Sequence, residues 1–159
     1  MNLYPHIPAA VISDCGQYRY MLSRQIGLTD RVVTFIGLNP STADATLDDP
    51  TIRRCIGFAK RRDAGLLVMV NLFALRSTDP RALQAHTEPV GPENDTWIDR
   101  AVSMADIAIA AWGNGGTLMG RSDAVRGRLQ QRLEALAITN TGMPKHPLYV
   151  RADAETVSY

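Results

Sequence analysis

The stretch VVTFIGLNPSTADATLDDPTIRRC, Val32 to Cys55, decides the fold. It begins as a continuous apolar run, which is typical of a strand that is covered on both faces. The run ends at Gly37-Leu38-Asn39-Pro40, and small polar and acidic residues follow it. The stretch therefore predicts a buried strand with a polar loop at its carboxyl end.

A helix is predicted directly after this loop. Asp49 is suited to the N-cap and Pro50 to the first helical position. Beyond them, apolar residues recur at helical spacing, at Ile52, Cys55, Ile56 and Ala59. These four residues form the expected inner face of the helix.

The rest of the chain alternates strands and helices. Residues 9–26 contain two short runs around Asp14-Cys15-Gly16, which predicts an antiparallel hairpin at an edge of the sheet. Asn94 is the expected cap of a second long helix. Buried strands are predicted at 65–75, 106–113 and 136–140, helices at 95–105 and 122–136, and one short helix within 76–92.

This order predicts an α/β fold of three layers, with a mainly parallel central sheet of about four strands, flanking helices and an N-terminal β-hairpin. At 159 residues the chain fits a single α/β domain, 1–159, with flexible tails at 1–8 and 152–159. Parallel sheets bind ligands outside the carboxyl ends of their strands. We therefore expect one site, at that edge.

Composition narrows the function classes. Hydrophobic residues make up 45% and charged residues 21%, which is globular and neither disordered nor fibrous. The net charge of +1 gives no global attraction to nucleic acid or to anionic membranes. No apolar run approaches the length of a membrane span, and the amino terminus lacks signal-like features, so we expect a cytoplasmic protein. Cys15 and Cys55 are expected to be reduced, half-buried core residues, because two cysteines cannot complete a structural metal site.

Polar side chains follow each predicted buried strand and should converge on one cleft. Asn71 lies in a buried strand, so its side-chain amide needs hydrogen-bond partners, and without them the protein loses roughly 1–3 kcal/mol of stability. Either a ligand or a neighbouring loop backbone can supply these partners. For Asn39, which precedes Pro40, the alternative to a role in the cleft is a purely structural role in forming a turn. The residues expected at this rim are Asn39, Asp44, Asp48, Asp49, Asn71, Arg76, Trp112, Asn114, Arg121, Lys145, His146 and Tyr149.

His146 lies in a loop that Pro144 and Pro147 stiffen. This suits a hydrogen-bonding or acid/base role better than metal ligation, and no metal or cofactor is expected. Gly113–Gly116 has neither the Walker nor the G-x-G-x-x-G spacing, and the nucleophile elbow of serine hydrolases is absent from the sequence. A nucleotide cofactor and a serine hydrolase are therefore both disfavoured.

The motifs GLNPSTAD, DDPTIRRC, VNLFALRSTDP, GPEND, AWGNGG and GMPKHPLY follow one another in this order. Over about Tyr18 to Tyr149 they resemble the bacterial and phage family catalogued as domain-of-unknown-function family 1643. They are also distantly similar to the uracil-DNA glycosylase superfamily. In that superfamily a G-x-[D/N]-P motif follows the first core strand, a buried Asn ends the next, a W-G lies on a later strand, and an H-P loop comes near the end.

The resemblance implies a role for each matching residue. Asn39 would position the attacking water, Asn71 would read the edge of the base, and His146 would stabilise charge on the leaving base. The superfamily loop usually reads H-P-S, whereas Leu148 follows Pro147 in this chain. An asparagine amide cannot accept the proton of water, so a general base would have to be Asp44, Asp48 or Asp49.

The expected activity is hydrolysis of N-glycosidic bonds in damaged or modified DNA. Two alternatives stay open: a catalytically inactive module that binds a modified base or nucleotide, and a hydrolase or transferase acting on a small nucleotide-derived metabolite. The expected partners are DNA or a nucleotide-like small molecule, and no membrane. The predicted substrate-binding residues are Asn71, Pro40, Phe73, Trp112, Asn114 and Tyr149. The predicted phosphate-binding residues are Arg53, Arg54, Arg76, Arg121 and Lys145.

Overall fold

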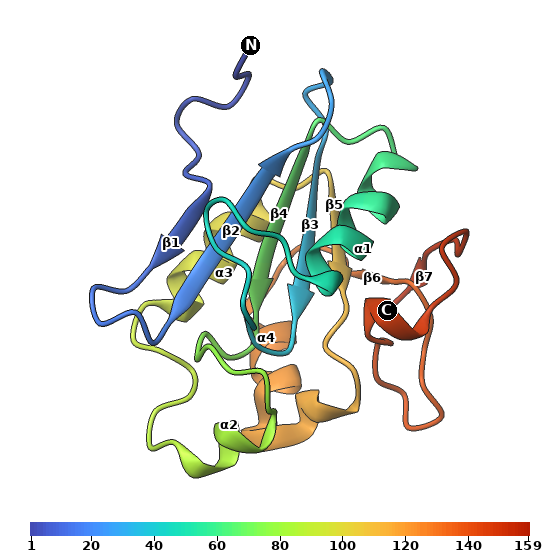
Figure 1. Cartoon of the computed structure of the whole chain (residues 1–159). Helices are drawn as coiled ribbons and strands as arrows, with labels where there is room; N and C mark the ends of the chain where they lie inside the picture. The colour runs from blue at the N-terminus through green and yellow to red at the C-terminus, as the bar shows by residue number, and fades with distance from the viewer.

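A computed structural model describes residues 1–159 and shows an α/β protein built around one seven-stranded sheet (Figure 1). The strands are β1 (Ala10–Ile12), β2 (Arg19–Gln25), β3 (Val32–Gly37), β4 (Leu66–Asn71), β5 (Ile107–Ala110), β6 (Glu134–Ala135) and β7 (Val157–Ser158). The α-helices are α1 (Pro50–Lys60), α2 (Arg81–Ala85), α3 (Asn94–Ser103) and α4 (Arg121–Arg128), and the 3-10 helices are η1 (Asn114–Gly120) and η2 (Pro147–Tyr149). None of the helices combines the length and the apolar composition that crossing a membrane requires.

The sheet has the order β1-β2-β4-β3-β5-β6-β7. The neighbours β4, β3, β5 and β6 run parallel to one another, whereas β1 with β2, β2 with β4, and β6 with β7 pair antiparallel. The sheet is therefore mixed rather than mainly parallel, and it has more than the four strands predicted. The difference arises because the N-terminal hairpin joins the sheet through β2, and the C-terminal segment adds β7.

The predicted N-terminal hairpin is confirmed, since β1 and β2 pair antiparallel at one edge of the sheet. Cys15, in the turn between them, is exposed rather than half-buried, while Cys55 is fully buried in α1. Both thiols are free.

Helix α1 begins where the sequence predicts. Asp49 is its N-cap, and Oδ1 of Asp49 accepts a hydrogen bond of 2.9 Å from the backbone N–H of Ile52. Pro50 is the first helical residue, where its missing N–H costs no hydrogen bond. Phe58 takes the inward position that the sequence predicts for Ile56, because the helix buries Ile52, Cys55, Phe58 and Ala59.

Helices cover both faces of the sheet and give the predicted three layers (Figure 1). Buried side chains of α1 pack with Phe35 and Met69 on one face. Those of α3 and α4 pack with Ile36 and Val70 on the other. Neighbouring residues of β3 and β4 thus face opposite cores, as the two-residue period of a strand requires.

Two elements late in the chain differ from the prediction. Helix α4 ends at Arg128 instead of continuing to Leu136, because Leu129 adopts an extended conformation with φ −82° and ψ 128°. The fourth parallel strand is Glu134–Ala135 and not residues 136–140. Leu136 is nevertheless buried. Its apolar character predicted burial correctly, but not the local backbone conformation.

Asn94 is not the cap of α3. Glu93 occupies the N-cap position, without a side-chain cap hydrogen bond. The Asn94 side chain is instead fully buried, and its Nδ2 donates to the carbonyls of Asn71 and Leu72 at 2.9 and 3.1 Å. Asn94 therefore ties α3 to the end of β4.

The segment 152–159, for which the sequence predicts a flexible tail, contains β7. This strand pairs with β6, and the ring of Tyr159 lies edge-on to Trp112 with the ring centroids 5.7 Å apart. The segment thus completes one edge of the sheet.

We expect Gly65→Ala to destabilise the protein, because a Cβ at this position would lie 1.8 Å from the carbonyl oxygen of Thr29. Since that neighbour is backbone, the connection into β4 must shift, at a cost of about 3 kcal/mol in the free energy of unfolding. Urea denaturation measures the loss.

Gly57→Ala is the matched control. No atom lies within 4 Å of a Cβ added at Gly57, which is in α1. Alanine favours the helix, so this variant should gain about 0.5–1 kcal/mol. A Gly65→Ala protein as stable as the wild type contradicts the close approach of Thr29.

Candidate functional site

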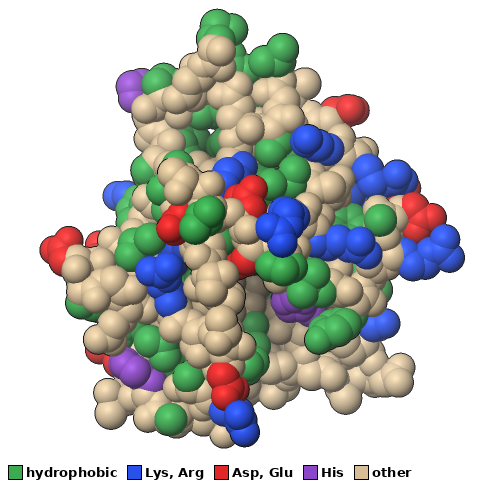
Figure 2. Space-filling model, viewed as in Figure 1, with side chains coloured by type: hydrophobic (Ala, Val, Ile, Leu, Met, Phe, Trp, Pro, Cys, Tyr) green, Lys and Arg blue, Asp and Glu red, His purple; other side chains and the backbone are tan.

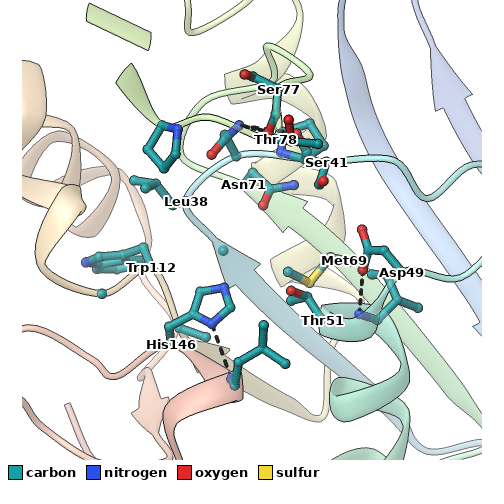
Figure 3. A pocket seen from close by; sticks show the side chains of 18 of the residues that line it. Leu38, Ser41, Asp49, Thr51, Met69, Asn71, Ser77, Thr78, Trp112 and His146 are labelled. Atoms are coloured by element: carbon teal, nitrogen blue, oxygen red, sulfur yellow. Dashed lines mark hydrogen bonds between the residues drawn. The ribbon is translucent and has the colours of Figure 1, made fainter. Parts of the chain in front are cut away.

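A cavity of about 390 Å³ opens at the carboxyl edge of β3, β4 and β5 (Figure 3). This is the edge at which the order of elements predicts a site. Its walls are partly apolar, formed by Leu38, Ile52, Met69 and Trp112. The polar lining includes Arg19, Asn39, Asp49, Asn71 and His146. Size and mixed lining are those of a site for a small ligand or group.

Asn71 ends β4 and brings an amide to the cavity (Figure 3). The residue is 2% exposed, and its Nδ2 has no hydrogen-bond partner in the protein. Its backbone carbonyl is satisfied separately, by the side chain of Asn94. No loop backbone therefore meets the need of the buried amide nitrogen, and such an unpaired group costs about 1–3 kcal/mol.

His146 precedes η2 and points its ring into the cavity (Figure 3). Its Nδ1 lies 3.2 Å from the backbone nitrogen of Leu148. A backbone N–H can only donate, so Nδ1 accepts and the proton of the neutral ring is on Nε2. Burial lowers the pKa of His146 and outweighs the opposing effect of Asp49, so the ring is neutral at pH 7. His146 thus offers a neutral N–H donor to a ligand.

Asn39 follows β3, and its amide nitrogen is held by the protein. Nδ2 donates to the carbonyls of Pro40, Leu75 and Ser77 at 3.2, 3.3 and 3.1 Å. Because only the nitrogen can donate, these three carbonyls define the orientation of the amide. Oδ1 is left as an acceptor at the cavity wall. Asn39 therefore both organises its turn and presents one free polar atom.

Two of the three aspartates predicted as general bases lie outside the cavity. Asp44 accepts the backbone N–H groups of Thr46 and Leu47, and these hydrogen bonds lower its pKa. Asp48 forms an ion pair of 2.8 Å with Arg24. Both carboxylates therefore organise the loop before α1 and do not face a ligand.

Asp49 does line the cavity, but the protein uses both of its carboxylate oxygens. Oδ1 accepts the N–H of Ile52 at 2.9 Å, and Oδ2 accepts that of Ala43 at 3.4 Å. Asp49 is thus first of all the cap of α1.

Arg19 is a cavity residue that sequence analysis missed. As the first residue of β2, which runs antiparallel to β4, it lies at the carboxyl edge of β4. It is 2% exposed, and burial lowers its pKa to about 10, so it stays charged at pH 7. A signal was present, because an arginine between Tyr18 and Tyr20 in a strand is a charge in an otherwise apolar setting.

Five of the six predicted substrate-binding residues line the cavity, and Phe73 does not. Phe73 is fully buried in the core that includes α3. Trp112 presents its ring to the cavity, but its Nε1 points away from it (Figure 3). Tyr149 is 77% exposed. The other predicted substrate-binding residues that line the cavity are Pro40, Asn71 and Asn114.

None of the five predicted phosphate-binding residues lines this cavity. Arg121 is buried, and it donates to the carbonyl of Leu72 and pairs with Asp95 at 2.8 Å. Figure 2 shows basic side chains gathered over α1 and the C-terminal segment, with acidic ones among them. Backbone carbonyls accept hydrogen bonds from Arg53, Arg54 and Arg76.

The fifth, Lys145, lines a second cavity of about 490 Å³ beside the first. The hydroxyls of Thr139 and Thr141 donate to Oδ1 of Asn114, at 2.7 and 2.8 Å, and fix the loop at this cavity. The residues that line both cavities are Gly113, Asn114, His146 and Tyr149.

The first cavity is arranged for hydrogen bonding and for stabilising negative charge. A neutral imidazole N–H, a buried amide and a buried guanidinium line one space between apolar walls. Such fixed donors stabilise charge that develops on a bound group. No group of three or more His, Cys, Asp or Glu side chains is placed to hold a metal ion.

Comparison with known proteins identifies one family. The family model described as "Protein of unknown function (DUF1643)" matches residues 19–148. The match runs from the start of β2 into η2, so it includes the cavity residues Arg19, Asn39, Asp49, Asn71 and His146. Searches of curated proteins and of solved structures found no match.

We expect Asn71→Leu to raise the free energy of unfolding by about 1 kcal/mol, because it removes an unpaired buried donor without opening a void. Urea denaturation measures the change. Asn94→Leu is the matched control, since Nδ2 of Asn94 donates to two buried carbonyls, and it should lose about 2–3 kcal/mol. An equal loss in both variants would falsify the unpaired state of Asn71.

We expect an NMR titration to place the pKa of His146 below the ordinary value of 6.5. As the pH falls from 6.5 towards that lower pKa, the unfolded chain binds a proton that the folded protein does not, so stability decreases. His146→Gln should remove this part of the pH dependence. Ring nitrogen shifts that show a proton on Nδ1 of the neutral ring, or a pKa above 6.5, would contradict the assignment.

Proposed function

The chain belongs to the family of proteins of unknown function DUF1643, and we propose that its cavity binds a nucleobase and that the protein hydrolyses the N-glycosidic bond of a damaged or modified base in DNA. One observation carries this proposal: the neutral His146 N–H and the unpaired Asn71 amide face the same partly apolar cavity. The distant similarity of the motifs to the uracil-DNA glycosylase superfamily supports it.

A nucleobase suits this lining. Its planar ring system packs against apolar walls such as Leu38 and Trp112. Its edge carries carbonyl and amino groups, which an asparagine amide recognises with two hydrogen bonds. Enzymes that act on a base in DNA take it out of the stack into such a pocket. Asn71 is the group at which recognition of the base edge would occur.

In the proposed reaction, the bond between the base nitrogen and the sugar carbon breaks, and its electron pair leaves with the base. The Nε2–H of His146 donates to a base oxygen on which negative charge develops. A water molecule adds to the sugar carbon, oriented by a hydrogen bond to Oδ1 of Asn39. The proton of that water passes to solvent, and the released base is protonated from solvent.

One observation favours a second candidate, a base-binding protein without catalysis. General-base activation of water needs a free acceptor of sufficient basicity. The Asn39 amide cannot accept the proton, and Asp49 already accepts two backbone hydrogen bonds. A reaction in which the glycosidic bond breaks before water adds demands less of a base. Product release therefore separates the two candidates, whereas binding alone does not.

We expect the protein to release a base from DNA that carries deaminated or modified bases. Duplex and single-stranded oligonucleotides are incubated with the protein, and abasic sites are detected by alkaline cleavage. His146→Ala and Asn39→Ala should each lower the rate about 100-fold, because each removes a group that acts on the reacting atoms.

The control is His86→Ala, which alters a histidine outside the cavity and should keep the wild-type rate. Binding to modified DNA without base release would replace the hydrolase by the base-binding candidate. Release that persists undiminished in His146→Ala contradicts the proposed role of the imidazole.

A further inference from the structure

We propose that Arg19 forms an anion-binding subsite at one end of the cavity and that a free nucleoside monophosphate binds there, with its phosphate against Arg19. This inference rests on the proposed recognition of a base, and it adds a free nucleotide to a base in DNA as a ligand of the same cavity. The base would lie at the end formed by Trp112 and His146.

The first argument is that most N–H donors of the Arg19 guanidinium have no acceptor in the protein. A guanidinium carries five N–H donors, and the protein supplies one acceptor, the carbonyl of Ala43, at 3.0 Å from Nη1. Nε is buried without a partner. None of the five ion pairs of the protein includes Arg19. Buried charges are normally paired, so an oxyanion in the cavity supplies what the fold does not.

Arg121 shows how the same fold treats a buried arginine with a structural role. It is 7% exposed, compared with 2% for Arg19. Arg121 donates through Nε and Nη2 to the carbonyl of Leu72, and it pairs with the carboxylate of Asp95. Arg121 does not line the cavity, whereas Arg19 does. The unpaired arginine is thus the one that a ligand can reach.

The second argument is the span of the cavity. Arg19 belongs to β2, and Trp112 follows β5, with β4 and β3 between these strands. Three interstrand spacings of roughly 4.8 Å separate the two ends, a span of about 14 Å. This exceeds the width of a single base. A base held near Trp112 and His146 therefore leaves the Arg19 end for a second group of the same ligand.

Hydroxyl groups add neutral donors along the cavity. Ser41, Thr51 and Thr78 line it together with Arg19, and Figure 3 shows Ser41 and Thr78 near Asn71. A guanidinium with hydroxyls in one concave space fits the oxygens of a phosphate. A base flipped out of DNA leaves its phosphates on the backbone, outside the pocket. A phosphate inside the cavity therefore belongs to a free nucleotide.

Asp49 is the acidic group that opposes an anion in this cavity. Its carboxylate caps α1 and accepts the N–H groups of Ile52 and Ala43. The positive end of the helix dipole therefore offsets part of its charge. Asp49 acts electrostatically on Arg19 but forms no ion pair with it, and Nε of Arg19 stays without a partner, so the guanidinium is open to a ligand at this end.

Calorimetry with the whole protein tests the inference. The probes are AMP, GMP, CMP, UMP and dTMP, their five nucleosides, and inorganic phosphate. We expect at least one monophosphate to bind about 30-fold or more tightly than its nucleoside, because a desolvated ion pair forms only with the phosphate. Arg19→Gln should remove this difference, and Arg19→Lys should retain part of it.

Arg132→Gln is the matched control, because it removes the same charge from an exposed residue that donates to Ser158 of β7, and it should leave the difference intact. Equal affinity of nucleoside and monophosphate for the wild type overturns the inference and leaves base recognition in place. This comparison needs no variant, so it decides even where Arg19→Gln fails to fold. Binding of no probe, with no base release, overturns both proposals.

Discussion

The structure depends on how the buried end of β4 is satisfied. The backbone carbonyls of Asn71 and Leu72 lie at the buried end of β4, where no water reaches them, and such groups must be paired. Asn94 donates to both, and Arg121 donates to the second. Since Asn94 begins α3 and Arg121 begins α4, these hydrogen bonds hold two helices to the sheet. Because Asn94 pairs with the backbone carbonyl of Asn71, the side chain of Asn71 is not needed for that purpose and stays free.

Buried asparagine and arginine side chains hold the fold together at some positions and line the cavity at others. The side-chain nitrogens of Asn94 and Arg121 donate to backbone carbonyls within the fold, although Oδ1 of Asn94 has no partner. Asn71 and Arg19 are also buried and keep unpaired nitrogen atoms. The second pair lines the cavity and the first does not. An unpaired buried group lowers stability unless a partner completes it, so a ligand that pairs with Asn71 and Arg19 would offset this cost at both positions.

Motifs in the sequence predicted several residues that line the cavity, because parallel strands end at one edge of a sheet. Asn39 and Asn71 follow buried strands, and the prolines around His146 mark a stiff loop, so their position along the chain was sufficient. Phe73 and Arg121 show the limit of this reasoning. A residue near a strand end faces either the cavity or the core, and the sequence motif is the same in both cases. The path of the following loop decides between them.

By itself the sequence determined the strand, loop and helix from Val32 to Lys60, including Asp49 as the cap of α1, because caps and apolar periodicity act over a few neighbouring residues. Tertiary structure alone decided that Arg19 belongs to the site. Its strand pairs antiparallel with β4, so its first residue, far from the motifs along the chain, lies at their edge of the sheet. The pairing of β2 with β4 joins segments that are distant along the chain, so it is decided by how the whole sheet packs and not by a local turn.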